Sequence, residues 1–321
     1  MTRQKIITVL RVGIAVVTLA AVVYAVVRNW ADMSVHLDKI SWATFAWSTL
    51  AAAVGTWLTM IGWKTLLADL GSDLHLAPAS GVYFVGQLGK YLPGSLWSVL
   101  VQADMASALK VPRRRTAVTG LLALGLALAT GFLVGLPAAS YLLTRTSTGF
   151  DWWLLLGIPI LVVLCVPRLL NALIARMLKT LRRDPLEHDL SGGAVLRAVV
   201  IFVLVWVAFG VHTLLLARAV AGEGAHPDLT TAAMTGYALS VSLGMLTVVL
   251  PAGLGAREGL LTLILSTAIP TPAAAAVAIM SRFIVTVVDV LAALGGWLYA
   301  RSHHLLRQRQ SEAEQVDDLS V

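Results

Sequence analysis

Long runs of apolar residues, separated by short polar segments, follow one another along the chain from residue 12 onward. A helix needs about 20 mainly apolar residues to cross the hydrocarbon core of a bilayer. By that measure the pattern predicts six full membrane spans, at residues 12–28, 42–63, 116–143, 152–170, 197–217 and 273–300. The sequence therefore predicts an all-α polytopic membrane protein.

Two further apolar stretches, 78–108 and 230–270, do not fit a simple span, because each contains a Leu-Pro break. The break lies at Pro93 in the first stretch and at Pro251 in the second. Proline removes a backbone donor and disfavours helix at the preceding residue. We therefore expect two re-entrant hairpins of broken helices, or eight membrane segments in all if the second hairpin spans.

Basic residues are distributed unevenly between the predicted loops. If both termini and residues 64–115 and 168–197 face the cytoplasm, 18 basic residues lie there and four lie outside. The remaining two, Arg257 and Arg282, fall within membrane segments. Because cytoplasmic loops are enriched in Lys and Arg, this bias predicts an inner- or plasma-membrane protein with both termini inside. The basic residues of the loop at 168–197 either form this orientation signal or make a platform for anionic lipid headgroups.

Composition excludes several protein classes. The chain is 58% apolar and only 13% charged, about half the charge of a typical soluble domain, which argues against a soluble enzyme and a disordered protein. Its single cysteine, Cys165, forms no intrachain disulfide. The net charge of +7 does not indicate nucleic acid, because the basic residues lie between apolar segments. We expect one membrane domain over 1–309 and a disordered acidic tail over 310–321.

The two predicted hairpins occupy matched positions and enter the membrane from opposite sides. Both contain Gly-Tyr or Gly-Val-Tyr near the start and Leu-Pro-(Ala)-Gly at the break. This is the pattern of an inverted repeat, with halves at about 30–170 and 197–300, in which broken helices form a transport site. Glycine and proline are also simply common in membrane helices, which would account for a single break. Backbone N–H groups at Gly253 and Gly255 are candidates to hold a phosphate oxygen.

Four ionisable residues fall within the predicted membrane segments: Arg257, Glu258, Arg282 and Asp289. A central charge costs roughly 2.5 to 3.5 kcal/mol on insertion scales, so such residues pair or face water. The spacing permits a crossed arrangement, with Arg282 against Glu258 and Arg257 against Asp289. In a functional reading, one arginine binds a phosphate in bidentate fashion, and a carboxylate takes a headgroup amine or a proton. Otherwise the four residues form structural ion pairs.

Three other polar residues have two readings each. Lys90 reaches the same cavity if the first hairpin goes deep, and otherwise snorkels among headgroups. Lys64 is better explained as an interfacial anchor, and His212 as a hydrogen-bonded packing residue, than as functional groups.

Two motifs at the hairpins resemble those of a known family, the lysylphosphatidylglycerol synthase transmembrane, flippase-like, domain. They read Gly89-Lys90-Tyr91-Leu92-Pro93-Gly94-Ser95 and Pro251-Ala252-Gly253-Leu254-Gly255-Ala256-Arg257-Glu258. The resemblance covers about residues 5–300 and implies a lipid transporter with its cavity between the hairpins. Its candidate substrate-binding residues are Lys90, Tyr91, Pro93, Gly94, Pro251, Gly253, Gly255, Arg257, Glu258, Arg282 and Asp289.

The chain departs from the family pattern in three ways. Lys90 stands where the first motif often has arginine, which keeps the charge but loses the fork geometry. Ala252 replaces a glycine of the second motif. The chain also stops about twenty residues after its last predicted span, so we expect a stand-alone member without the soluble aminoacyl-transferase domain.

Three function classes remain in view. The first is a transporter that moves a polar-headed lipid, with an anionic phosphate, between leaflets. The second is a membrane-embedded lipid-modifying transferase, although the sequence has no paired Asp motif and no His-Glu-x-x-His. The third is a non-transporting scaffold for a partner enzyme of envelope-lipid synthesis. We expect no cofactor and no metal, and the sequence carries no nucleotide-binding glycine loop of the Gly-x-x-x-x-Gly-Lys-Ser/Thr type.

Overall fold

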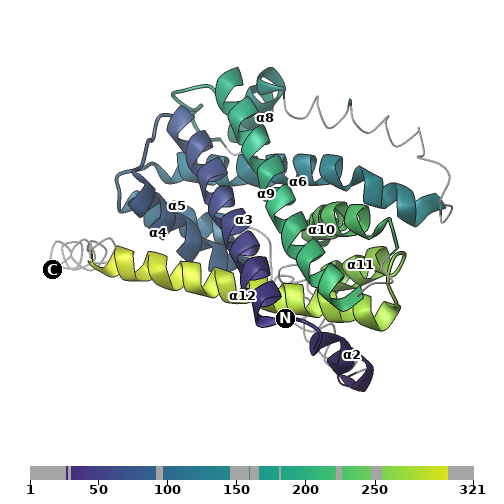
Figure 1. The fold of residues 1–321 in the computed structure, drawn as a ribbon. Coiled ribbons are helices and arrows are strands. Elements are labelled where there is room, and N and C mark those ends of the chain that lie inside the picture. Colours follow the sequence, from purple (N-terminus) through teal and green to yellow (C-terminus); the bar gives the residue numbers. More distant parts are fainter. Residues whose placement is uncertain are drawn as a thin grey trace, which may run out of the picture.

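The computed structural model describes residues 27, 30–91, 97–144, 159, 166–180, 182–221, 226–246 and 255–302. Within these ranges the chain forms helices and connecting turns, and no strand. The elements are α2 (Trp30–Leu37), α3 (Trp42–Asp69), α4 (Leu76–Gln87), the 3-10 helix η1 (Leu88–Tyr91), α5 (Trp97–Ser107), α6 (Arg113–Thr144), α8 (Pro167–Thr180), α9 (Gly192–Ala221), α10 (Leu229–Leu246), α11 (Ala256–Leu265) and α12 (Thr271–Ser302) (Figure 1). The predicted all-α fold is confirmed.

Five of the described helices are long and apolar enough to cross a membrane: α3, α6, α9, α10 and α12. Four of them correspond to the predicted spans 42–63, 116–143, 197–217 and 273–300. The fifth, α10, is the first arm of the second predicted hairpin, so this arm has the length of a full span. The predicted span 12–28 lies almost wholly outside the described residues, and the total number of spans stays a prediction.

The predicted boundary of the span 152–170 is wrong at its end. Residues 167–170 belong to α8, which begins at Pro167 and continues to Thr180 through a segment expected to be loop. Proline is well suited to the first turn of a helix, because the N–H that it lacks is unpaired there anyway. Leu170, Ile174 and Leu178 are buried at intervals of four residues, so this helix is amphipathic.

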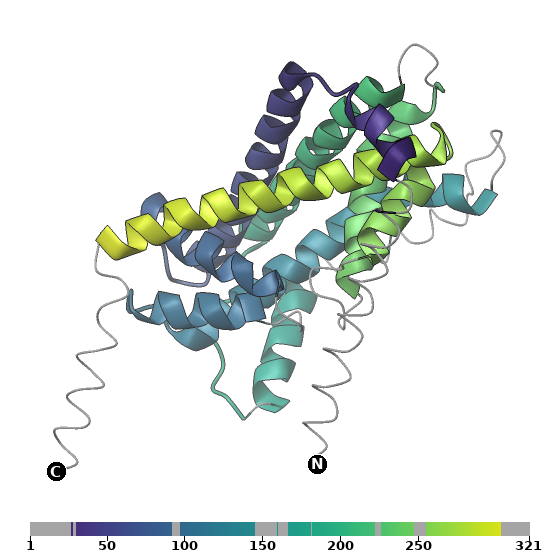
Figure 2. The same ribbon diagram turned by 90° about the horizontal axis from the view of Figure 1, so that it is seen from below.

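Helices α3 and α9 pack side by side through the centre of the molecule (Figures 1 and 2). Small residues of α3 accept large side chains of α9 at the contact. A Cβ atom at Gly55 would lie 2.9 Å from the Phe209 ring, and one at Gly62 would lie 3.0 Å from the Phe202 ring. Glycine at these two positions therefore allows the close approach of the two helices, because a Cβ atom at either position would force the phenyl ring to shift.

Each predicted hairpin consists of two helical arms that pack against each other. In the first, α4 and η1 contact α5, and a Cβ atom at Gly89 would lie 2.6 Å from the Ser98 backbone nitrogen. In the second, α10 contacts α11, with Gly236 against Ile264 and Gly244 against Arg257. The glycines of the two segments thus serve the close packing of their arms.

Each hairpin packs against a long helix from the other half of the chain. Helix α4 packs against α12, whereas α10 packs against α6. Helix α12 runs along both hairpins and crosses α3 and α9 (Figures 1 and 2). The order of helix, hairpin and helix occurs twice, as α3, α4–α5, α6 and as α9, α10–α11, α12. Inversion of the second set relative to the first stays a prediction.

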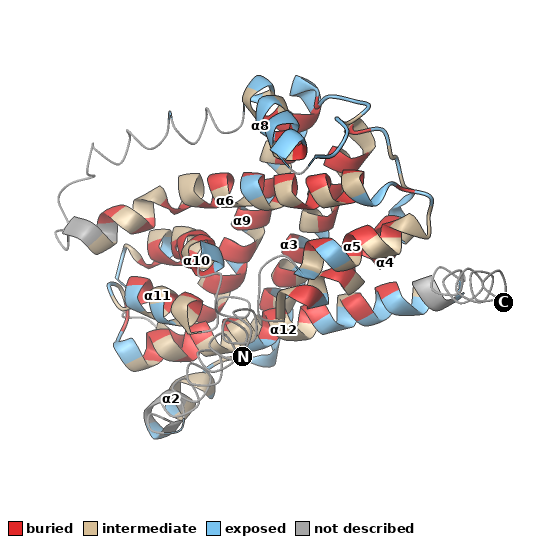
Figure 3. Ribbon diagram, turned by 180° about the vertical axis from the view of Figure 1, so that it is seen from behind, coloured by how far each residue is buried: buried red, intermediate tan, exposed pale blue. Residues whose placement is uncertain are grey.

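The outer surface carries large apolar side chains that would be unfavourable in water. Trp42 and Trp47 on α3, Leu196 on α9 and Leu291 and Leu298 on α12 are all more than half exposed. Exposed and buried residues alternate along the long helices, so each has an inner and an outer face (Figure 3). Apolar patches of this extent indicate contact with lipid, and the chain is an integral membrane protein.

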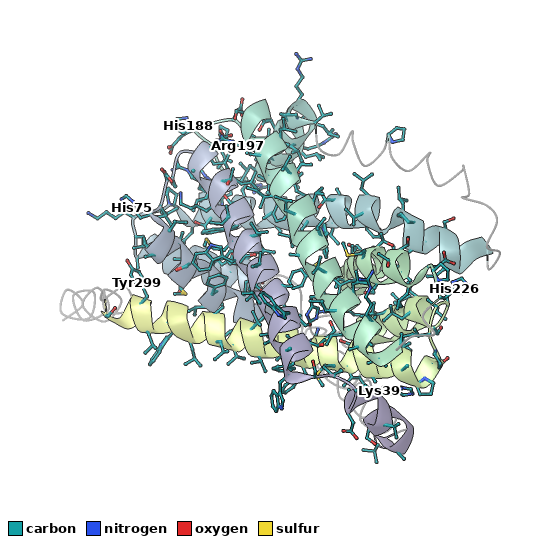
Figure 4. The ribbon with its side chains drawn as sticks, in the orientation of Figure 1. Lys39, His75, His188, Arg197, His226 and Tyr299 are labelled. Atoms are coloured by element: carbon teal, nitrogen blue, oxygen red, sulfur yellow. The ribbon has the colours of Figure 1, made fainter. Side chains whose placement is uncertain are left out.

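Polar residues near the ends of the helices and in the connecting segments gather at two opposite sides of the molecule. His75, His188 and Arg197 lie on one side, and Lys39 and His226 lie on the other (Figure 4). The first three belong to segments predicted to be cytoplasmic, and the last two to segments predicted to be outside.

Candidate functional site

A cavity of about 390 Å³ lies between the hairpins and the long helices. Its charged lining comes from η1, α11 and α12, and its uncharged polar lining mainly from α3, α4 and α5. Apolar side chains of α6, α9 and α10 form the remaining wall. The volume is within the roughly 300–1,000 Å³ of typical small-molecule sites. One cavity therefore offers charged, hydrogen-bonding and apolar surfaces at membrane depth.

Asp289 of α12 is the centre of the first charged cluster. Its buried carboxylate oxygen Oδ2 lies 2.7 Å from Lys90 Nζ and accepts a hydrogen bond of 2.7 Å from the Tyr91 hydroxyl. Lys90 lines the cavity, as expected for a deep first hairpin, while the depth of that hairpin in the membrane stays a prediction. Asp289 thereby links the tip of the first hairpin to the last helix.

Glu258 and Arg282 form the second charged pair. Glu258 Oε1 lies 3.6 Å from Arg282 Nε, and both side chains are less than one-fifth exposed. The other carboxylate oxygen accepts a 2.7 Å hydrogen bond from the Gly255 N–H. Gly255 has a φ of 84° and is the N-cap of α11, so Glu258 both caps this helix and pairs with α12. This pair matches half of the crossed arrangement.

Arg257 has a different partner from the one that the crossed arrangement assigns to it. Its Nη2 atom donates a 2.6 Å hydrogen bond to the Tyr237 hydroxyl, and its guanidinium lies 4.7 Å from the centre of that ring. Tyr237 in turn stacks on Phe209, with the ring centres 5.0 Å apart. The pairing of Arg257 with Asp289 is therefore wrong. Helix α12 turns Asp289 toward η1, while the start of α11 packs Arg257 back onto α10.

The two arginines, Arg257 and Arg282, differ in whether a nearby carboxylate balances their charge. Among the residues that the structure describes, no carboxylate lies within 4 Å of Arg257, although its residue is only 8% exposed. Arg282 has Glu258 beside it. Counted together, three cations and two carboxylates leave the site with one net positive charge.

The structure describes only some of the glycines and prolines that were predicted to form the site. Pro93, Gly94, Pro251 and Gly253 lie outside the described residues. Gly255 is described, and its N–H group donates to Glu258 in this structure, while phosphate binding at Gly255 stays a prediction. A carboxylate three residues into a helix is well placed to take this N–H.

Most residues that line the cavity were not predicted from the sequence, among them Tyr237, Trp63 and Gln102. Tyr237 holds Arg257, while Trp63 and Gln102 contribute polar groups from α3 and α5. Gln102 stands in the otherwise mainly apolar run 97–103, and that isolated polar residue is the signal that would have identified it. Trp63 carries no comparable signal, because tryptophan is also common at membrane interfaces.

Two residues lie in structural contacts away from the charged clusters. His212 is fully buried, with Nδ1 2.7 Å from Ser48 Oγ and Nε2 2.9 Å from Ser281 Oγ, which confirms its reading as a hydrogen-bonded packing residue. Lys64 pairs with Asp73 at 2.7 Å on the exposed end of α3. The hydrogen bond and charge of Lys64 lower the pKa of the Asp73 carboxyl from its usual 3.8.

Within the described ranges, no group of three or more His, Cys, Asp or Glu side chains is arranged to hold a metal ion. A family model described as the lysylphosphatidylglycerol synthase TM region matches residues 9–293 of the chain. A comparison with curated proteins gives no significant match.

Proposed function

Because the chain belongs to the lysylphosphatidylglycerol synthase transmembrane family, we propose that it moves phospholipids between the two leaflets of the membrane. The family consists of membrane proteins of lipid metabolism or transport. The observation that carries the more specific proposal is the cavity, in which ionisable residues of both hairpins meet those of the last helix.

The cavity suits a lipid headgroup that passes through the protein while its acyl chains stay in the bilayer. Charged groups inside a membrane are costly, so their concentration at one cavity points to a polar substrate there. The wall formed by Leu124 and Ala127 of α6 and Val205 of α9 is apolar and suits the hydrocarbon next to the headgroup. A polar pathway beside an apolar wall matches the two parts of a phospholipid.

Two ion pairs offer a mechanism for opening and closing this pathway. Lys90–Asp289 ties the first hairpin to α12, and Glu258–Arg282 ties the second hairpin to the same helix. A headgroup phosphate competes with the carboxylates for the cations, so its binding loosens these ties. In this proposal, movement of the hairpins relative to α12 then exposes the cavity to one leaflet or the other.

The orientation belongs to the same proposal. In this proposal the side that carries His75, His188 and Arg197 (Figure 4) faces the cytoplasm. Both termini are proposed to lie on the same side. Labelling of single cysteines by a membrane-impermeant maleimide, in a Cys165→Ser background, tests this. Ser72→Cys should react only from the cytoplasmic side and Lys39→Cys only from the outside; the reverse pattern would contradict the orientation.

The proposal is tested by reconstituting the full chain in liposomes and following leaflet exchange of fluorescent phospholipids. Exchange should require the protein and should fall by about tenfold or more in Glu258→Gln, since a loss of 1.4 kcal/mol is tenfold. Arg218→Gln is the matched control, because Arg218 is exposed and bonds only Thr230 among the described contacts. Its exchange rate should equal that of the unmodified chain.

Two experimental outcomes would favour the other two function classes, the scaffold and the lipid-modifying transferase. If folded protein exchanges none of several lipids, with or without an ion gradient, the transport proposal fails and a scaffold role takes its place. If the protein instead changes the headgroup covalently, and turnover depends on an added metal ion, a membrane-embedded transferase becomes the better explanation.

A further inference from the structure

We propose that α8 is an interfacial helix that binds anionic lipid headgroups of the adjacent membrane leaflet through a row of basic side chains. Residues 167–183 contain five basic residues and no acidic one. Arg168, Arg176 and Lys179 recur at helical spacing and are exposed on one face of α8, and we call them the basic ridge. The described lining of the cavity contains no residue of α8, so the inference does not depend on the proposed transport.

Helix α8 starts where the lipid-facing surface of the protein starts. Asn171 Nδ2 donates to the Leu190 carbonyl oxygen at 3.1 Å, and Asn171 Oδ1 accepts from the Leu190 N–H at 3.0 Å. Leu190 lies just before the start of α9 at Gly192, and Leu196 of α9 is already 64% exposed. The first half of α8 is therefore fixed beside the end of a helix that is long enough to span a membrane.

The axis of α8 lies crosswise to the long helices. Figure 1 looks almost along α8, whereas α3, α6, α9 and α12 run across the same view. These four helices have the length and apolarity of membrane spans. A short helix that lies crosswise to the spans, at the end of one of them, runs along the membrane surface, which is the position of interfacial amphipathic helices.

Three kinds of side chain occupy three faces of α8. Leu170, Ile174 and Leu178 are buried in the core of the protein. Val166, just before the helix, and Leu173 are apolar and are 39% and 50% exposed. The basic ridge forms the third face, and the exposed side of α8 is visible in Figure 3. An exposed apolar flank beside a basic face is typical of a helix that lies in the headgroup region with its apolar side against the acyl chains.

The basic ridge has no carboxylate partner within 4 Å among the described residues. Of the acidic residues that follow it in the sequence, Asp184 and Glu187 turn toward α6. They pair there with Arg114 at 3.7 Å and with Arg115 at 2.6 Å. Asp189 is exposed and forms no ion pair within the described ranges. The tertiary structure thus draws counter-charges away from the ridge and leaves its cations accessible.

Other basic residues of the segments near α8 are paired. Lys64 Nζ lies 2.7 Å from Asp73, and Arg113 Nη2 lies 2.8 Å from Asp104. An orientation signal depends on the number of basic residues in a loop and does not require that they stay unpaired in the folded protein. The accessible charges of the ridge therefore indicate a binding surface in addition to that signal. Clusters of Lys and Arg at a membrane surface attract anionic lipids.

The apolar flank decides between a membrane and a soluble partner. An acidic polypeptide or a nucleic acid would match the charges of the ridge but would leave Val166 and Leu173 in water. A lipid leaflet satisfies both groups, because it offers phosphates to the basic side chains and acyl chains to the apolar ones.

The experiment places a fluorophore beside the basic ridge of the full chain in phosphatidylcholine bilayers. The fluorophore is attached to Ala172→Cys, an exposed position of α8, in a Cys165→Ser background. Two quencher lipids carry the same nitroxide-labelled acyl chain, one with a serine and one with a choline headgroup. The serine lipid should reach half-maximal quenching at about one-fifth of the mole fraction that the choline lipid needs. A fluorophore at Lys39→Cys, on the opposite side of the molecule (Figure 4), should show no such preference.

Variants separate the ridge from the overall charge of this side. Arg176→Gln combined with Lys179→Gln should reduce the preference for the serine lipid to about twofold or less. Lys64→Gln combined with Arg113→Gln is the matched control, because it removes the same charge from residues that are already paired. This control should keep the preference. Leu173→Ser should weaken quenching by both lipids and leave their ratio unchanged.

Salt gives an independent check of the same contact. Raising the salt concentration from about 0.1 M to about 1 M shortens the screening length from about 10 Å to about 3 Å. The preference of the unmodified chain for the serine lipid should therefore decrease, while quenching by the choline lipid stays the same. Equal unfolding temperatures of all variants show that a changed preference is not a loss of folding.

Four results would overturn the inference. Absence of quenching by both lipids would place α8 away from the bilayer, and salt-sensitive binding of soluble polyglutamate would then assign the ridge to an acidic protein. Equal quenching by the two lipids would remove the charge selectivity. A preference that survives the loss of Arg176 and Lys179 would remove the ridge as its cause. A preference that falls equally in the matched control would assign it to the net charge of this side.

Discussion

The two hairpins carry corresponding positions in the chain, yet they bring different chemistry to the cavity. The first contributes a lysine and a tyrosine, Lys90 and Tyr91, which both reach across to Asp289 of α12. The second contributes Arg257, which is held on Tyr237 of its own first arm, and Glu258, which also caps its own second arm. The first hairpin is thus tied mainly to a neighbouring helix, whereas the charges of the second are fixed mainly within it.

The first arms of the two hairpins also differ in length. Helix α4 has 12 residues, too few to cross a bilayer, whereas α10 has 18 and is long enough. A short hairpin joined to α12 by a flexible lysine is suited to move, and a longer hairpin with a fixed arginine is suited to hold an anion. Under the proposed function, the two hairpins would divide gating and binding between them.

The largest effect on stability is expected from removing the carboxylate of Asp289, which pairs with Lys90 of the first hairpin. Asp289→Asn leaves Lys90 without its carboxylate, and breaking a buried ion pair by removing one partner costs about 3–5 kcal/mol. Lys90 is one-third exposed, so we expect the free energy of unfolding to fall by about 2 kcal/mol. Thermal unfolding in detergent checks this. A restoring effect of the added change Lys90→Met would support the pairing, and no restoration would contradict it.

The packing of the two hairpins gives an effect on stability of similar size. Gly89→Ala in the first hairpin places a Cβ atom 2.6 Å from the Ser98 backbone nitrogen, and such overpacking costs about 1–3 kcal/mol. Gly259→Ala in α11 of the second is the matched control, because nothing lies within 4 Å of its Cβ position. Alanine is favoured over glycine within a helix, so this variant should be more stable by up to about 1 kcal/mol. Unfolding midpoints that move in the same direction would contradict the assigned packing.

A smaller effect is expected for the ion pair that joins the second hairpin to α12. Glu258→Gln keeps an oxygen for the cap at Gly255 but removes the charge opposite Arg282. In a double-mutant cycle with Arg282→Gln, we expect a coupling of about 1 kcal/mol in the free energy of unfolding. A double variant that is no milder than the sum of the two single changes would show that these side chains do not interact.

The smallest effect is expected outside the membrane, between α3 and the first hairpin. Lys64 lowers the pKa of Asp73, so the folded state binds a proton at this carboxyl less readily than the unfolded state does. Its contribution to stability is present above the usual pKa of 3.8 and is lost as pH falls through the lowered value. Asp73→Asn should therefore lower the unfolding midpoint slightly at pH 7 and not at strongly acid pH. An equal change at both pH values would assign the effect to something other than this charge.

Much of the fold followed from the apolar pattern, because length and hydrophobicity alone decide whether a helix suits a bilayer. The spans that correspond to α3, α6, α9 and α12 were predicted in this way. Helix α8 was not, since its alternating apolar and basic residues lack the continuous run by which spans are recognised. The break at Pro251 predicted an interrupted segment and left open whether the segment spans the membrane, and α10 before the break has the length of a span.

By itself the sequence determined that the protein folds in a membrane, and it predicted two interrupted segments and four ionisable residues within membrane segments. Only the tertiary structure decided which charges meet. The rotation of α12 against η1 places Asp289 beside Lys90 and not beside Arg257. The packing of α11 on α10 places Arg257 beside Tyr237. Composition and periodicity report local preference, whereas an ion pair depends on how distant helices are turned toward each other.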